Sequence, residues 1–275
     1  MNDNTQISQT QLKMTWLSML QQGLNLPSFR DVQFSLYSQN GEDGILLYIF
    51  TLIGTTNRKV LEICAGDGIN CNSTNLITNQ GWHGLLFDGN NKKLDRGREF
   101  YRKDSRTSFW PPNLQSEWIT KDNINDLVSS NYFEGEIDLL SIDLDGNDYW
   151  IFDALDVVQP RVVVAEYQAA WGPDMNITQR YQEDFDWSAY QKENIGHVFT
   201  GASLGALAEA ADRKGLRLVG CEPRCINAFF VRKGLAEDLL PTMEPSACFD
   251  HPMAKFNIAR INDSINPEDP FWVKV

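Results

Sequence analysis

The chain has 275 residues, ordinary charged and apolar fractions, and a formal net charge of −13. A chain of this length buries one large core, so we expect one domain with extensions. The negative charge, with no run of Lys or Arg to offset it, argues against binding to nucleic acid or to an anionic membrane surface.

The N-terminal segment is polar and then amphipathic, and it lacks the apolar stretch and small-residue cleavage site of a signal peptide. No window is long and apolar enough for a membrane span. We therefore expect a cytoplasmic protein whose partner is a small molecule or another neutral acceptor. An N-terminal helix carrying Trp16, Leu17 and Leu20 can pack on its own domain or on a partner, which leaves a homodimer open.

The five cysteines are an odd number. The spacing of Cys221 and Cys225 hints at zinc, but no second close pair accompanies them. In a reducing compartment we expect all five cysteines to be free structural thiols.

Short apolar runs alternate with amphipathic segments from about residue 58 onward, a pattern typical of a parallel α/β sheet. The runs at 137–144 and 161–167 are the strongest strand predictions, because strands buried on both faces have this near-continuous apolar composition. In chain order the predicted strands cover 59–64, 83–89, 116–120, 137–144, 161–167, 216–221 and 227–233, with helices at 72–80, 90–104, 122–133, 148–158 and 203–215.

The last two predicted strands are separated only by residues 222–226, too few for a crossover helix, so they should be antiparallel neighbours. A seven-stranded, mostly parallel sheet with a terminal antiparallel hairpin and helices on both faces is the Rossmann-like arrangement of class I methyltransferases. Ordinary dinucleotide-binding sheets lack this ending.

The segments outside the sheet define the predicted domain organisation. Residues 1–50 form an N-terminal helical extension, 51–235 the core, and 236–275 a C-terminal extension. Within the core, residues 168–200 are aromatic and polar with little periodicity. A connection this long in a compact domain usually has a function, so we expect a lid or an acceptor-binding loop.

The segment 59–70 combines a strand with a glycine loop that opens a helix. Gly66 and Gly68 allow a ligand to approach the backbone closely, and amide groups at the helix start point toward it. About 20 residues later the next strand ends at Asp88, a position where an acid usually accepts hydrogen bonds from ribose hydroxyls.

Cys71 and Asn72 stand where the third glycine of the dinucleotide fingerprint would fall, which argues against a bound pyrophosphate. A sulfonium nucleoside carries ammonium and ribose groups but no phosphate, so it suits a site lined by acids. The acids expected there are Glu62, Asp67 and Asp88.

A second group of acids follows the strand predicted at 137–144. Asp143 and Asp145 share a face if strand pairing continues through Gly146, whereas a turn at Asp145 leaves Asp143 facing the site alone. Glu166 ends the adjacent strand and supplies a third oxygen, and three oxygens suit Mg²⁺ or Ca²⁺ better than zinc. We expect Asp143 and Glu166, with Asp145 or Gln168, to orient an acceptor directly or through a divalent cation.

His197 lies near the predicted acceptor side, just before the helix at 203–215. Because an imidazole titrates near neutral pH, His197 is the residue expected to accept the acceptor's proton.

Five segments in order resemble the FkbM-like branch of S-adenosylmethionine-dependent methyltransferases over about residues 36–233. They are "YSQNGEDGIL", "EICAGDGINCNSTNLITNQGWHGLLFDG", "LLSIDLDGNDYWIFDAL", "VVVAEYQ" and "GLRLVGCEPRCINAFFVRK". The branch is associated with O-methylation of sugars and other hydroxyl-bearing small molecules. The chain departs from it in the Cys-Ala-Gly loop and at Gln168, where Asn is expected.

The resemblance implies a role for each motif of the cofactor site. It assigns the ribose to Asp88, the adenine side to Asp122 or Asn123, and the path of the methyl group to Asp143. The residues that it places along the methionine moiety are Glu62, Gly66 and Gly68.

Two other enzyme classes and one non-enzymatic function remain as alternatives. The stretch 143–147 resembles the Asp-x-Asp-Gly-Thr motif of metal-dependent phosphatases, but several predicted strands precede it and Asn147 replaces the Thr. A sugar-nucleotide transferase is the weaker of the two enzyme alternatives, because only the Asp-x-Asp of residues 143–145 supports it. A non-catalytic binding module on a methyltransferase fold also stays open, because fold does not determine function.

Overall fold

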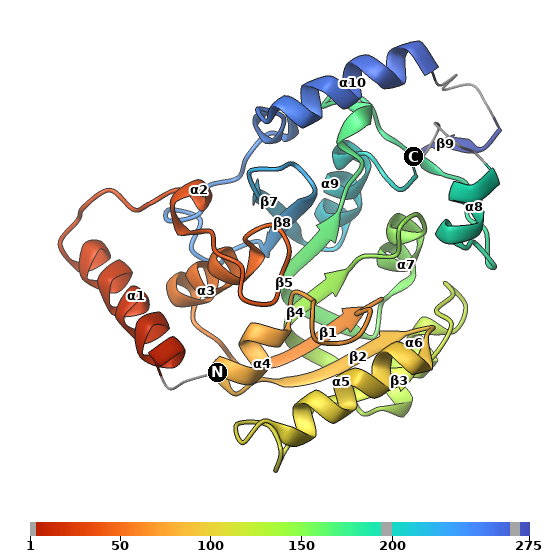
Figure 1. Cartoon of the computed structure of the whole chain (residues 1–275). Helices are drawn as coiled ribbons and strands as arrows, with labels where there is room; N and C mark the ends of the chain where they lie inside the picture. Colours follow the sequence, from red (N-terminus) through yellow and green to blue (C-terminus); the bar gives the residue numbers. More distant parts are fainter. Residues whose placement is uncertain (1–3, 194–199, 265–269) are drawn as a thin grey trace.

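The computed structural model describes residues 4–193, 200–264 and 270–275. Within these ranges, seven strands form one central sheet: β1 (Lys59–Ile63), β2 (His83–Asp88), β3 (Asn113–Ser116), β4 (Gly135–Ile142), β5 (Val158–Glu166), β7 (Leu216–Cys221) and β8 (Asn227–Arg232). Across the sheet the strands lie in the order β3-β2-β1-β4-β5-β8-β7 (Figure 1).

The directions of the strands confirm the predicted topology. β1 to β5 run parallel, whereas β8 lies antiparallel between β5 and β7. The carboxyl ends of the five parallel strands therefore meet at one edge, which is where open α/β sheets bind their ligands.

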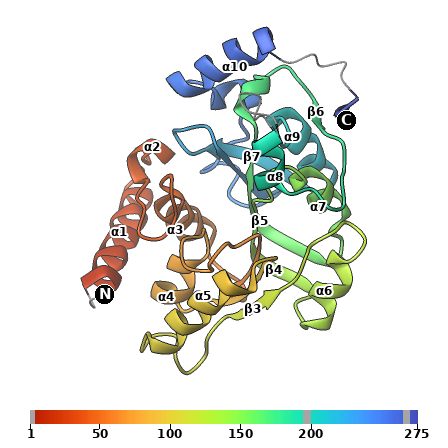
Figure 2. The ribbon, with the colours of Figure 1, turned by 45° about the vertical axis from the view of Figure 1, so that its right-hand side comes forward.

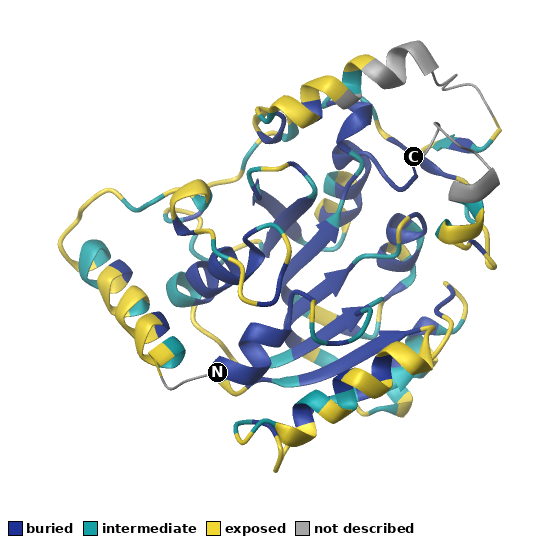
Figure 3. Ribbon diagram, in the orientation of Figure 1, coloured by how far each residue is buried: buried dark blue, intermediate teal, exposed yellow. Residues whose placement is uncertain are grey.

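Helices cover both faces of this sheet. One face carries α3 (Glu42–Ile53), α4 (Thr74–Gln80) and α5 (Asn91–Lys103), and the other carries α6 (Ile124–Ser130), α7 (Asp148–Ala154) and α9 (Leu204–Arg213). Successive strand residues alternate between the two buried clusters, so Val163 packs toward α7 and Val164 toward α3. In Figure 3 the strands and α3 and α4 are mostly buried, while α5 exposes its outer side.

Several element boundaries differ from the sequence prediction; for example, the helix predicted at 148–158 ends at Ala154, and β5 begins at Val158. The third strand covers Asn113–Ser116 instead of 116–120, because its pairing with β2 ends at Asp88 opposite Ser116. The helix predicted at 122–133 is shorter: α6 begins at Ile124, with Asn123 in the N-cap position.

The N-terminal helix α1 (Asn4–Gln21) packs on its own domain, beside α3 and α4. Trp16 is buried and its ring meets Tyr48 of α3 edge-on, with 5.1 Å between the ring centroids. The buried side chain of Gln9 donates a 2.7 Å hydrogen bond to Asn75 Oδ1 on α4. A short helix, α2 (Phe29–Val32), follows. None of the helices described is both long and apolar enough to cross a membrane.

The predicted insertion and the C-terminal extension meet in space. The insertion holds the 3-10 helix η1 (Ala169–Trp171), β6 (Ile177–Gln179) and α8 (Trp187–Glu193), and the C-terminal segment holds η2 (Pro245–Cys248), α10 (Pro252–Ser264) and β9 (Trp272–Lys274). β6 and β9 pair antiparallel, and Trp171 meets Trp272 edge-on at 4.6 Å between ring centroids. Figure 2 shows β6 beside the C-terminus of the chain. This second, two-stranded sheet was not predicted. All five cysteines are free, as expected.

Candidate active site

A cavity of about 440 Å³ lies at the carboxyl ends of β1, β2, β4 and β5. Its wall is completed by residues 38–42, which lead into α3, and by the start of β8. Among the described residues, Lys93 is the only basic side chain that lines it. The carboxylates that line it are Glu42, Glu62, Asp88, Asp143, Asp145 and Glu166.

A second cavity, of about 390 Å³, lies between α2, the turn from β7 to β8, and residues 239–251. Its lining is mainly apolar, and it contains none of the acids at the ends of the parallel strands. The charged cavity is therefore the candidate active site.

Glu62 lies near the end of β1 and is buried. Its two carboxylate oxygens accept 2.9 Å hydrogen bonds from the backbone amides of Asn72 and Ser73, and Oε1 also accepts a bond from the Ser141 hydroxyl. These amides belong to the start of α4, where a helix has no carbonyl partners for them. Glu62 therefore holds the glycine loop in place, and it lines the cavity while doing so.

The two glycines of the loop have different surroundings. Gly66, with φ of +61°, lines the cavity, and a Cβ there would find no atom within 4 Å. Gly68 also has a positive φ, but its Cβ would lie 2.9 Å from Leu114 Cδ2. Asp67 accepts hydrogen bonds from the amides of Ile69 and Asn70 and does not line the cavity.

Asp88 ends β2 and lines the cavity, and its role toward a ribose stays a prediction. Its oxygens accept a 2.9 Å bond from the Gly66 amide and a 2.8 Å bond from the Asn90 amide. Each carboxylate oxygen can accept a further bond, so Asp88 both anchors the glycine loop and keeps capacity for a ligand.

The structure does not bring Asp122 or Asn123 to the cavity lining. Asp122 is exposed and lies 3.5 Å from the Lys121 ammonium. The Asn123 side chain accepts a bond from the Thr120 amide and donates one to the Trp118 carbonyl. These two residues shape the loop after β3.

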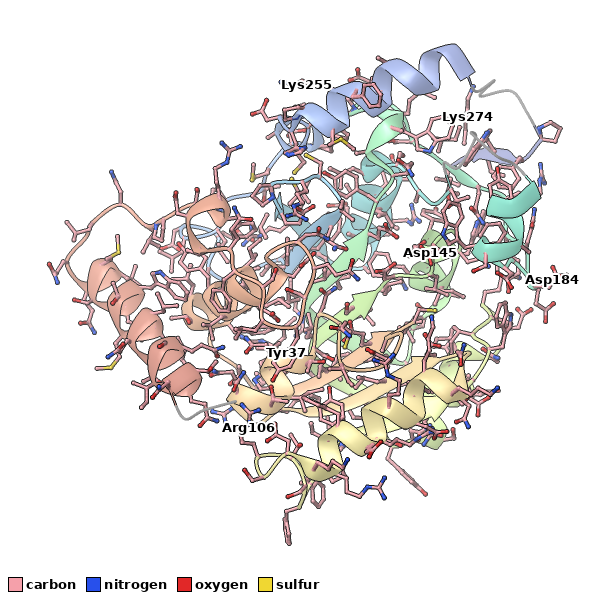
Figure 4. All side chains as sticks on the ribbon, in the orientation of Figure 1. Tyr37, Arg106, Asp145, Asp184, Lys255 and Lys274 are labelled. Carbon is pink, nitrogen blue, oxygen red and sulfur yellow. The ribbon has the colours of Figure 1, made fainter. Side chains whose placement is uncertain are left out.

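Asp143, Asp145 and Glu166 converge as expected: one carboxylate oxygen from each lies within 4.8 Å of the other two. β4 ends at Ile142, and Asp145 has a left-handed backbone with φ of +55°, so the chain turns there instead of continuing the strand. The expectation that such a turn leaves Asp143 facing the site alone is wrong, because Asp145 still lies beside Asp143 and lines the cavity. Figure 4 shows Asp145 near the centre of the molecule beside α7.

Neighbouring acids perturb each other in this cluster. The carboxyl groups of Asp143 and Glu166 lie within hydrogen-bonding reach, and burial, followed by the charge of nearby carboxylates, raises the pKa of both. Burial also raises the pKa of Asp145, which the charge of Lys93 partly offsets. Two carboxyl groups this close do not both ionise readily without a counter-charge.

Asp148 keeps the chain after β4 in its turned path. Its buried carboxylate accepts bonds from the Leu144 amide at 2.7 Å and the Gly146 amide at 2.9 Å. Asp148 therefore positions the backbone that carries Asp145.

Gln168 does not line the main cavity. Its Oε1 accepts a bond from the Ala170 amide and its Nε2 donates one to the Thr200 carbonyl. Together with Asp145, Glu166 and Trp187 it lines a pocket of about 90 Å³ next to the acid cluster. His197 lies outside the described residues.

Two parts of the cavity wall were not expected from the sequence. Residues 38–42 contribute one of them, held by Asp43, whose carboxylate accepts bonds from the amides of Leu36, Tyr37 and Ser38. Asn227, the first residue of β8, contributes the other. For residues 38–42, the sequence features that could have indicated a site are the adjacent acids and Gly41, whose φ is +99° in the structure.

No protein-family model matches the chain, and no curated protein matches it. The fold is similar to those of solved S-adenosylmethionine-dependent methyltransferases. One, from Clostridium acetobutylicum ATCC 824, has 11% identity and a TM-score of 0.44, over 71% of this chain and 93% of that chain.

Two other solved structures of this kind were crystallised with the demethylated cofactor product. PKMT2 from Rickettsia typhi has 13% identity and a TM-score of 0.48, over 74% of this chain and 55% of that chain. Magnesium protoporphyrin IX methyltransferase from Synechocystis PCC 6803 has 10% identity and a TM-score of 0.42, over 70% and 82% of the two chains. Similarity at this level carries no residue roles over to this chain.

Proposed function

We propose that the chain is an S-adenosylmethionine-dependent methyltransferase of the FkbM-like branch that methylates a hydroxyl group of a small acceptor such as a sugar or glycan. The carboxylate-lined cavity at the ends of the parallel strands carries this proposal. A sulfonium nucleoside is cationic and has no phosphate, so it suits such a lining, whereas the pyrophosphate of a dinucleotide would be repelled. The antiparallel β8 between β5 and β7 supports the same conclusion.

In this proposal Asp88 accepts hydrogen bonds from the ribose hydroxyls. Gly66 lets the methionine moiety approach the backbone, because no side chain occupies that part of the cavity. Glu62 contributes by fixing the glycine loop, and Asp143 faces the methyl group.

The acid cluster then serves the acceptor. Its hydroxyl oxygen attacks the methyl carbon in line with the departing sulfur; the carbon–sulfur bond breaks, and sulfur keeps the electron pair as a neutral thioether. The hydroxyl proton goes to a carboxylate of the Asp143–Glu166 pair, of which Glu166 lines both the main cavity and the pocket that contains Trp187. His197 remains a proposed base.

The oxygens of Asp143, Asp145 and Glu166 also fit a divalent cation such as Mg²⁺, which prefers carboxylate ligands. A cation held there would lower the pKa of an acceptor hydroxyl.

Thermal unfolding with S-adenosylmethionine, S-adenosylhomocysteine and NAD⁺ tests the cofactor assignment. We expect both sulfur compounds to raise the melting temperature and NAD⁺ to leave it unchanged, since a saturating ligand at about 100 times its Kd adds about 2.7 kcal/mol. Asp88→Asn should weaken S-adenosylhomocysteine binding about tenfold or more, while the exposed control Asp95→Asn should not.

No effect of either sulfur compound would contradict the cofactor assignment. Hydrolysis of p-nitrophenyl phosphate would then favour the phosphatase alternative, and the lack of it a binding module.

A further inference from the structure

Asn227 lies directly beside the acid cluster. It opens β8 and is paired with Glu166 of β5 in the antiparallel register. Val164 and Phe229, two residues along each strand, both belong to the buried cluster on the α3 side of the sheet. Because side chains alternate along a strand, Glu166 and Asn227 point toward that same side, where Asp143 lies in the shared cavity.

The orientation of the Asn227 carboxamide is fixed by Glu42. Asn227 is 5% exposed, and its Nδ2 donates a 2.7 Å bond to Glu42 Oε1. The other oxygen of Glu42 accepts a 2.7 Å bond from the Asn40 amide, so this carboxylate is itself held in place. The nitrogen of Asn227 therefore faces Glu42, and its oxygen faces away from Glu42.

That oxygen, Asn227 Oδ1, is buried and has no hydrogen-bond partner among the described residues. A buried hydrogen-bond acceptor without a partner lowers the stability of the folded state. Native proteins therefore rarely contain one unless a water, an ion or a ligand interacts with it. The three acids of the cluster, Asp143, Asp145 and Glu166, line the same cavity and offer this oxygen no donor when they are ionised. A cation satisfies all four oxygens at once.

We propose that Asn227 Oδ1 is a fourth protein ligand of a divalent-cation site formed with Asp143, Asp145 and Glu166, and that Glu42 is the positioning residue that orients it. Ligand oxygens on opposite sides of Mg²⁺, Mn²⁺ or Ca²⁺ lie about 4–5 Å apart, and the three carboxylate oxygens are within 4.8 Å of one another. The all-oxygen set matches these hard cations.

This proposal corrects the predicted ligand set. Gln168 was expected to join the acids, but its oxygen already accepts a bond from the Ala170 amide and its nitrogen already donates to the Thr200 carbonyl. Asn227 supplies the amide oxygen instead, from the antiparallel strand. A hydrogen-bonded carboxylate behind a metal ligand, as Glu42 is behind Asn227, typically changes metal affinity 10- to 100-fold when removed.

Titration of the full chain with Mn²⁺, followed by the electron paramagnetic resonance signal of the free ion, tests the site without an acceptor. We expect one ion per chain for the unmodified protein. Asn227→Leu should weaken binding at least tenfold, Asn227→Asp should restore it because an oxygen returns, and Glu42→Gln should weaken it about tenfold. Gln168→Leu, the matched control, should bind Mn²⁺ as the unmodified chain does.

Absence of Mn²⁺ binding to the unmodified chain, or equal binding by Asn227→Leu, would overturn the proposal and leave a water or a carboxyl proton as the partner of Asn227. The inference extends the proposed function but is separable from it, since S-adenosylhomocysteine binding is measured on the same samples by thermal shift. Mn²⁺ binding without S-adenosylhomocysteine binding would leave the cation site standing and reject the methyltransferase. Circular dichroism and the Asn227→Asp variant show whether loss of binding reflects misfolding.

Discussion

Glu62 Oε2 accepts a 2.9 Å hydrogen bond from the amide of Ser73, the N-cap of α4, so an acid expected to face the cofactor is tied to the start of that helix. Its other oxygen binds the Asn72 amide in the same way. The residue thus acts on the cofactor loop through the backbone as well as by its charge in the cavity.

Replacing Glu62 by Ala should lower the free energy of unfolding by about 2–4 kcal/mol, because two buried amides lose a charged acceptor. Urea denaturation measures the change, and S-adenosylhomocysteine affinity should fall with it because the loop loses its anchor. The control Glu209→Ala removes an exposed carboxylate of α9 and should change stability by less than about 0.5 kcal/mol. A stable Glu62→Ala protein with weakened cofactor binding would show that Glu62 acts only as a ligand.

Gly66 and Gly68 allow a matched comparison, because both have positive φ and a methyl group strains each backbone by about 1–2 kcal/mol. In Gly66→Ala the methyl group projects into the cavity, so cofactor affinity should fall about tenfold or more. In Gly68→Ala it meets Leu114 Cδ2 instead, so stability should fall further while cofactor affinity changes less. Calorimetry with S-adenosylhomocysteine and urea denaturation separate the two effects; the reverse order of affinities would place the cofactor elsewhere.

Asp43 should make stability depend on pH. Burial raises its pKa from 3.8 to about 6, despite bonds from the amides of Tyr37, Leu36 and Ser38 that favour the charged form. A carboxyl group with a higher pKa in the folded state contributes stability below its unfolded pKa and loses it as pH rises through about 6. At about 1.4 kcal/mol per pKa unit, the rise corresponds to about 3 kcal/mol.

Denaturation at pH 4, 5, 6 and 7 checks this prediction by comparing the unmodified chain with Asp43→Asn. The contribution of Asp43 is the pH dependence of the free energy of unfolding that is present in the unmodified chain and absent from the variant. This contribution should decrease between pH 4 and about 6. Identical slopes in the two proteins would mean that Asp43 keeps an ordinary pKa.

The pairing of β6 with β9 should be lost more easily than the main sheet. Trp272→Ala removes the ring that packs on Trp171 and Ile177, at a cost of about 3–5 kcal/mol for an aromatic core residue. We expect backbone amides of β6 to exchange hydrogen about 100-fold faster or more, with S-adenosylhomocysteine affinity unchanged. Met253→Ala, at a side chain that is 55% exposed, serves as the control. Unchanged exchange in Trp272→Ala would show that other contacts hold the insertion.

The main sheet could be predicted because its signals are local. Apolar runs such as 161–167 mark strands buried on both faces, and the short link at 222–226 forces an antiparallel pair. β3 was misplaced because its four residues, Asn113–Ser116, carry only one buried side chain, and its register depends on contacts with β2.

The roles of individual acids were harder to predict, because a carboxylate at a strand end can bind a ligand or a backbone amide. Asp143, Asp145 and Glu166 converge as expected, since adjacent parallel strands bring their ends together. The Asp67 carboxylate accepts hydrogen bonds from amides of its own loop, and this interaction depends on the backbone conformation after Gly66. Asn227 escaped prediction because its neighbours, Glu42 and Glu166, are remote in sequence.

The six carboxylates that line the cavity have one more consequence if the proposed cofactor binds there. Methyl transfer converts a positively charged sulfonium into a neutral thioether. The cavity therefore attracts the reactant more strongly than the product, and the attraction at sulfur disappears at the moment the methyl group leaves. The same carboxylates that help to bind the sulfonium cofactor bind the thioether product less tightly. The charge of the cavity therefore favours product release and, with it, turnover.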